Sequence, residues 1–293
     1  MTSTAVQDPA SAARTGTSST PVVSARDRLP YVLSGALVVV AGLSATLSLL
    51  VPSQLTGSTV STGNMRGTAL ALLVVGLPVF TMAVVRTARG SPRALVVALG
   101  TLGYLLYQAV LFCFAVPLNN LFLLYVADLG LSLWTLVAFL LRADLAAFGG
   151  RLSPRTPVKR LAAVALTLAA LNAAAWLAQI IPATTTAHPR TLLADTGLLT
   201  NPVFVQDLAV WLPLLTAAAI ACWHRRSWGV LVVGAMLAMF VLESVSIASD
   251  QWFGSRADPS SPSASMAAVP LFAGVAVVLA LVLVWYSRHL DRS

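Results

Sequence analysis

The chain alternates between long apolar runs and short polar connections. Each run holds about 20 predominantly apolar residues, enough for an α-helix to cross the roughly 30 Å hydrocarbon core of a bilayer. No amphipathic helix pattern, as would cover a soluble core, separates the runs. The pattern therefore predicts an all-α, polytopic integral membrane helix bundle with eight transmembrane helices. The expected spans are 30–51, 68–86, 94–115, 118–141, 159–181, 203–223, 227–248 and 267–287.

The segments outside these spans are short, so we expect a single transmembrane domain over residues 30–287. Residues 1–29 are rich in Ser, Thr, Ala and Pro and predict a disordered cytoplasmic tail, and residues 288–293 predict a second, short tail. The first apolar run is longer than the core of a signal peptide and lacks a small-x-small cleavage site, so we expect it to stay uncleaved. No internal repeat relates the first four runs to the last four.

Basic residues are distributed unevenly between the connections. Of the eighteen Lys and Arg residues, all but Arg66, Arg190 and Arg256 fall in the tails or in every second connection. By the positive-inside rule, this predicts that both termini are cytoplasmic. The formal net charge of +8 is thereby explained by topology, and nucleic-acid binding is not indicated. The Arg- and Ala-rich composition favours a bacterial protein of the cytoplasmic (inner) membrane.

Three acidic residues fall inside the apolar spans: Asp128, Asp207 and Glu243. An ionisable group in a membrane helix is costly and is by default a functional candidate. Apart from Arg86, Lys159 and Arg160 at the cytoplasmic ends, no Lys, Arg or His lies within the expected spans to pair with them. The three acids are therefore expected to be hydrogen-bonded, protonated or bound to a cation.

Other polar side chains follow the spacing of a helix face near these acids. Tyr107 and Gln108 share a face of the third span, and Tyr125 precedes Asp128 by three residues on the fourth. In the predicted orientation they lie in the outer half of the bilayer, which suggests a polar, aromatic-lined cavity open to the outside. The alternative is that these polar groups only form hydrogen bonds between packed helices.

Catalytic and cofactor motifs are absent from the sequence. Cys113 and Cys222 lie in different runs near opposite membrane faces, and the three His residues lie in loops or tails. No metalloprotease, nucleophile-elbow or phosphate-loop motif is present. We therefore expect no cofactor, leave a metal open, and consider an enzyme less probable than a binding or transport protein.

Two stretches carry a resemblance to a family of functionally uncharacterised polytopic bacterial membrane proteins. They are YQAVLFCFAVPLNNLFLLYVADLGLSL (107–133) and LLTNPVFVQDLAVWLP (198–213). The positions that carry it are Tyr107, Asn120, Tyr125, Asn201, Pro202 and Asp207. The resemblance implies the topology, and it supports a site among these Tyr, Asn and Asp side chains without implying an activity.

These observations lead to three functional hypotheses. In the first, the protein is a transporter or small-ligand or cation-binding protein, with ligand-binding residues Asp128, Asp207, Glu243, Tyr107, Gln108, Tyr125 and Asn120. In the second, it is a non-catalytic membrane subunit or assembly factor whose partner is another membrane protein. In the third, it is an intramembrane enzyme that acts on a lipid-linked substrate with carboxylates as acid and base.

Overall fold

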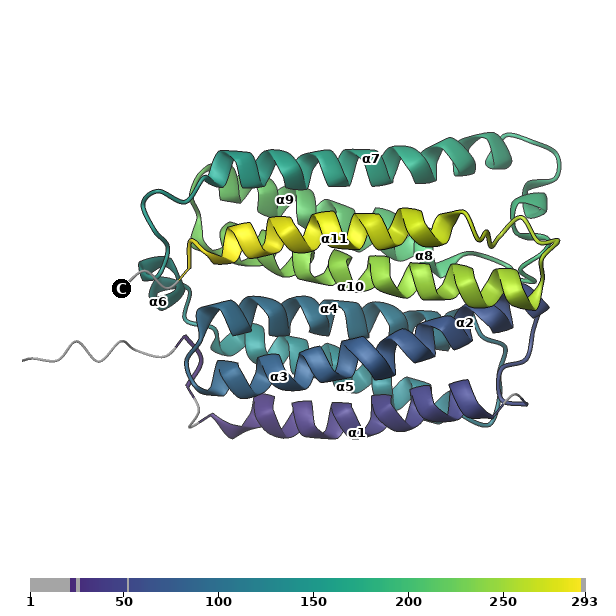
Figure 1. Cartoon of the computed structure of the whole chain (residues 1–293), viewed down its shortest axis with the longest axis horizontal. Helices are drawn as coiled ribbons and strands as arrows, with labels where there is room; N and C mark the ends of the chain where they lie inside the picture. The colour runs from purple at the N-terminus through teal and green to yellow at the C-terminus, as the bar shows by residue number, and fades with distance from the viewer. Residues whose placement is uncertain (1–21, 25–26, 52, 291–293) are drawn as a thin grey trace, which may run out of the picture.

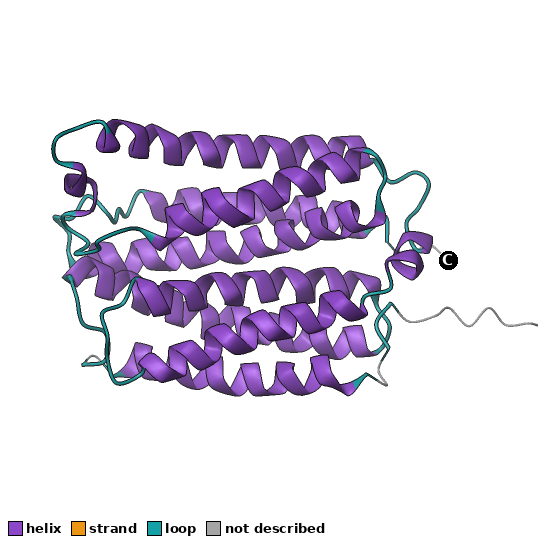
Figure 2. Cartoon of the chain, turned by 180° about the vertical axis from the view of Figure 1, so that it is seen from behind, coloured by secondary structure: helices purple, strands orange, loops and turns teal. Residues whose placement is uncertain are grey.

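The computed structural model describes residues 22–24, 27–51 and 53–290 and confirms the all-α bundle. Eight helices are long and apolar enough to cross a membrane, and they run up and down between two ends (Figures 1 and 2). The spans are Arg28–Leu50 (α1), Thr59–Ala88 (α2 to α3), Pro92–Phe114 (α4), Phe122–Arg142 (α5), Val158–Thr184 (α7), Pro202–Trp223 (α8 to α9), Ser227–Ala257 (α10) and Ala268–Ser287 (α11). Most of the predicted N-terminal tail, and residues 291–293, lie outside the described residues.

Two of the spans contain a π-helical segment just before a proline. In the second span, α2 (Thr59–Ala71) leads through η2 (Leu72–Gly76) into α3 (Leu77–Ala88). In the sixth span, α8 (Pro202–Gln206) leads through η4 (Asp207–Trp211) into α9 (Leu212–Trp223). Because a proline ring clashes with the preceding turn of an α-helix, a wider turn before Pro78 and Pro213 accommodates it. The N–H of Leu77 accordingly donates to the carbonyl of Leu72, five residues back.

These matching segments are a similarity of backbone geometry between the two halves of the chain, and they do not bear on the expectation that no repeat is visible in the sequence. Residue 72 corresponds to residue 207, an offset of 135 that matches the separation of several other paired features. The pairs are Leu77-Pro78 with Leu212-Pro213, the Thr81 and Thr216 hydroxyl bonds to Leu77 and Leu212, the left-handed turn residues Gly90 and Arg225, and the helix starts Pro92 and Ser227. The repeat is one of backbone geometry, and few side chains are shared.

The two halves meet where α10 packs against α2 and α4, and α4 and α10 occupy equivalent places in the halves. Figure 1 shows α1 to α5 on one side of this junction and α7 to α11 on the other. Because each half has four helices, equivalent helices run parallel, and an axis that relates them lies along the membrane normal. Equivalent residues then touch: a methyl group placed on Gly100 would overlap the carbonyl oxygen of Ala235, its partner at the same offset. The contacts between α4 and α10 therefore follow a local pseudo-twofold axis that lies between these two helices.

The structure corrects two expected loops, 52–67 and 249–266. Helix α2 begins at Thr59, capped by the Ser58 side chain, and α10 continues to Ala257. These extensions contain polar residues, yet they are helical and pack against each other. Gly63 and Gly67 form a Gly-x-x-x-Gly stripe of the kind that lets two membrane helices approach closely. The Ser249 hydroxyl then reaches the Gly67 carbonyl at 2.8 Å.

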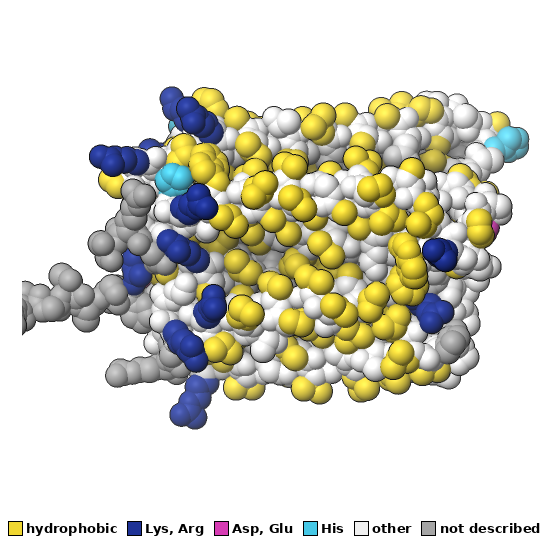
Figure 3. Space-filling view, in the orientation of Figure 1, with side chains coloured by type: hydrophobic (Ala, Val, Ile, Leu, Met, Phe, Trp, Pro, Cys, Tyr) yellow, Lys and Arg dark blue, Asp and Glu magenta, His cyan; other side chains and the backbone are white. Residues whose placement is uncertain are grey.

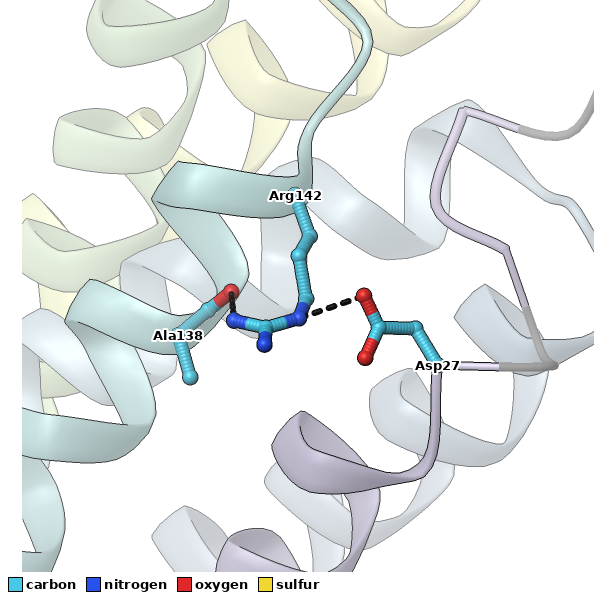
Figure 4. Close-up of polar contacts among 3 residues, drawn as sticks. All are labelled: Asp27, Ala138 and Arg142. Atoms are coloured by element: carbon cyan, nitrogen blue, oxygen red, sulfur yellow. Dashed lines mark hydrogen bonds and ion pairs between the residues drawn. The ribbon is translucent and has the colours of Figure 1, made fainter.

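Basic side chains gather at the end of the bundle that carries both described ends of the chain, called here the Arg-rich end (Figure 3). There, Arg142 at the end of α5 pairs with Asp27, the residue before α1, and also donates to the Ala138 carbonyl (Figure 4). Within the predicted tail, Val22 is buried, and its carbonyl accepts a hydrogen bond from the Asp144 N–H just before α6 (Leu145–Gly150).

Candidate functional site

A polar cluster lies between α4, α8 and α10, in the half of the bundle remote from the Arg-rich end. At its centre, the Gln108 amide Nε2 donates to Glu243 Oε2 at 2.8 Å. Gln108 is 1% exposed, whereas Glu243 stays partly accessible. The pair joins α4 to α10, so it lies at the junction of the two halves.

Asp207 extends the cluster towards the outer wall of the second half. It is the first residue of η4, and its Oδ2 accepts a hydrogen bond from the Trp176 indole of α7 at 2.7 Å. Its neighbour Gln206 accepts from the Trp211 indole at 3.2 Å and donates to the Tyr107 carbonyl at 3.4 Å. Single π-helical turns recur at functional sites, and here the wide turn begins at a buried carboxylate.

A third acid, Asp250, belongs to the cluster, and the sequence analysis missed it. Its Oδ1 accepts a hydrogen bond from the Thr68 hydroxyl of α2 at 2.9 Å. Asp250 follows Glu243 by seven residues, so both lie on one helix face with Ser246. This spacing was the available signal. Because residues 249–266 are expected to form a loop, Asp250 is not among the predicted site residues.

Three polar atoms in this region are buried and make no hydrogen bond of good geometry among the described residues: the Tyr104 hydroxyl, the Gln108 Oε1 and the Ser246 hydroxyl. Tyr104 and Ser246 are 1% and 0% exposed, and their hydroxyls interact with each other, whereas no interacting group is found for the Gln108 Oε1 among the described residues. Native proteins leave few buried polar atoms unpaired, so such a group calls for an explanation such as a bound water or ion.

The charges of the cluster act on one another. Glu243 lies within electrostatic reach of both Asp250 and Asp207. The hydrogen-bond donors to the three carboxylates in the described part of the chain are neutral: Gln108 for Glu243, Trp176 and Tyr107 for Asp207, and Thr68 for Asp250. Neutral donors stabilise a carboxylate without cancelling its charge, so the cluster attracts protons or cations.

The remaining predicted site residues lie elsewhere. Asp128 is buried on α5 and accepts a hydrogen bond from Ser132 at 3.4 Å, one turn along the same helix. The Tyr125 hydroxyl bonds to Ser48 of α1 at 2.9 Å. Asn120 is exposed in the turn between α4 and α5. The structure thus brings together Asp207, Glu243, Tyr107 and Gln108, and places the other three within or beside the first half.

The donor types in the cluster bear on what it could bind. Among the described residues, no three His, Cys, Asp or Glu side chains come together as a metal-binding group. Besides the Gln108 Nε2 that donates to Glu243, the cluster offers carboxylate, amide and hydroxyl oxygens, which suit hard cations better than transition metals. Two surface grooves, along α3 and α9 near the Arg-rich end, do not include these residues.

Comparisons with protein-family models, curated proteins and solved structures find no match to this chain. The chemistry of the cluster is therefore inferred from its own residues.

Proposed function

We propose that the protein binds a small solute or cation at the cluster of Asp207, Glu243 and Asp250 and carries it across the membrane. The observation that supports this most directly is the gathering of three carboxylates with neutral donors inside a membrane bundle. Ionisable groups within a bilayer are expensive, and in transporters they mark ion and substrate pathways. The position of the cluster between two parallel repeats is also where transporter sites are found.

We place the protein in the bacterial cytoplasmic membrane with both termini in the cytoplasm, on the basis of the Arg distribution. The cluster then lies in the outer half of the bilayer and would receive its ligand from outside. We also propose that the family resemblance reflects common descent. Of the positions that carry it, Tyr107 and Asp207 lie in the cluster, whereas Asn120 and Tyr125 do not.

Thermal unfolding of the detergent-purified protein across pH and a panel of cations and small solutes tests this function. We expect at least one condition to raise the melting temperature of the wild type, and Asp207→Asn or Glu243→Gln to abolish that shift. Asp128→Asn is the matched control, because Asp128 is a buried acid outside the cluster. If all four proteins respond alike, the acids only join helices, and a search for a co-purifying partner protein becomes the better course.

A further inference from the structure

The hydrogen-bonded pair at the centre of the cluster has a special place in the repeat. Gln108 and Glu243 are separated by 135 residues, the same offset that relates the π segments, the prolines and the helix starts. They are therefore equivalent residues of the two halves, and they touch each other across the pseudo-twofold axis. One half supplies an amide at this position and the other a carboxylate.

Neutral oxygens lie close to this pair in the chain, one helical turn away on the same two helices. Gln108 Oε1 is buried without a partner among the described residues, and the buried Tyr104 and Ser246 hydroxyls interact only loosely with each other. Tyr104 also lies within electrostatic reach of Glu243. The other two acids lie within electrostatic reach of Glu243 but are hydrogen-bonded to donors on other helices, Asp207 to Trp176 and Asp250 to Thr68. The pair itself therefore holds one carboxylate, with the neutral oxygens of Gln108, Tyr104 and Ser246 on the same two helices.

We propose that Glu243 and Gln108 form a binding site for a single monovalent metal cation on the pseudo-twofold axis, with Tyr104 and Ser246 as neutral ligands. One carboxylate balances one positive charge, and oxygen donors suit a hard cation such as Na⁺. This inference rests on the proposed function and names its ligand class. Because Gln108 and Glu243 are equivalent positions, the site should also bind the cation when the carboxylate is at position 108 and the amide at position 243.

The test uses four forms of the full-length protein in detergent: wild type, Glu243→Gln, Gln108→Glu and the exchanged pair Gln108→Glu/Glu243→Gln. Sodium chloride is titrated against choline chloride at constant ionic strength, and the rise in melting temperature gives the apparent affinity. Loss of a ligand carboxylate is expected to weaken sodium binding by about tenfold or more. The exchanged pair is expected to recover an affinity within about threefold of the wild type.

Tyr104→Phe keeps the ring and removes only the hydroxyl, so it serves if an exchanged variant fails to fold. It is expected to weaken sodium binding while leaving the melting temperature in choline unchanged. Direct binding of radioactive sodium provides a second readout that does not depend on unfolding.

Several results would overturn the inference. If the exchanged pair binds sodium as poorly as Glu243→Gln, the site belongs to Glu243 alone, and the proposed function still stands. A larger response to calcium than to sodium would contradict the single-charge assignment. A wild type that ignores sodium but responds to another ligand through Asp207 would remove the axial site and keep the proposed function. If no response depends on Asp207 or Glu243, both the cation site and the proposed function are contradicted.

Discussion

At the scale of single residues, each buried acid of the cluster accepts a hydrogen bond from a neutral donor on a neighbouring helix. Thr68 serves Asp250, Trp176 serves Asp207 and Gln108 serves Glu243. A buried acceptor that loses its donor costs more than an ordinary hydrogen bond contributes, because its desolvation is no longer offset. These donors should therefore matter for stability as well as for binding.

Thr68→Val removes the hydroxyl and keeps the shape of the side chain. Because Asp250 then loses its donor, we expect the protein to be destabilised by roughly 1–3 kcal/mol, seen as a lower melting temperature in detergent. Thr68→Ser retains the hydroxyl and should unfold close to the wild type. Equal melting temperatures for the Val and Ser variants would show that the Thr68–Asp250 bond has no energetic role.

Asp195, in the connection between α7 and α8, is an acid outside the spans. Partial burial raises its pKa, but hydrogen bonds from Ser261 and Ser263 outweigh this and hold the pKa below its ordinary value. Since the folded-state pKa is lowered, the stabilisation is complete above the ordinary pKa of about 4 and is lost as pH falls through the lowered value.

Ser261→Ala should therefore raise the pKa of Asp195 and loosen this connection at a higher pH than in the wild type. Carboxyl NMR of selectively labelled aspartate would follow the titration, with Asp195→Asn identifying the signal. An unchanged titration curve in Ser261→Ala would contradict the role assigned to this bond.

At the scale of helices, hydropathy predicted every span, but it placed the start of the second span and the end of the seventh too close to the middle of the helix. Asn64, Arg66 and Asp250 are too polar for a lipid-facing helix, so the expected boundaries stopped short of them. The extra turns of α2 and α10 are stable because glycine residues let the two helices pack closely against each other. A methyl group on Gly67 would lie 2.6 Å from the Cα of Asp250, which leaves no room for a side chain.

Gly67→Ala should consequently force α2 and α10 apart and destabilise the protein by about 1–3 kcal/mol, as overpacking does. Gly35→Ala is the matched control, because no atom lies within 4 Å of a methyl group placed on Gly35 of α1. Thermal unfolding of both variants in one detergent measures the difference. If Gly67→Ala melts like Gly35→Ala, the close approach is not needed for stability.

At the scale of the whole molecule, the basic residues lie mainly at one end of the bundle (Figure 3). The positive-inside rule predicts that this Arg-rich end is cytoplasmic. A fluorescent protein fused after Ser293 should therefore fluoresce. Alkaline phosphatase inserted in the connection between α10 and α11 should be active, because that connection would be outside. The reverse pattern would invert the topology and place the cluster in the inner half of the bilayer.

The backbone repeat and much of the site could not be predicted from the sequence, because equivalent positions hold different residue types. Gln108 and Glu243 differ in chemistry, as do Gly90 and Arg225, so no residue pattern shows that they are equivalent. Helical periodicity did predict that Tyr107 and Gln108 share a face. It could not separate Asp128, which stays beside Ser132, from the acids that meet across helices.

The sequence by itself determined that eight helices span a membrane, where most of them begin and end, and which end carries the positive charge. These properties depend on local hydrophobic length and on charge counts, because the bilayer imposes them on each helix separately. Only the tertiary structure decided that Asp250 lies in a helix and which acids lie together. It also revealed that two residues 135 positions apart face each other on an axis. Such features arise from packing between helices, and packing in a membrane depends on the shape and polarity of distant surfaces that meet only in the folded bundle.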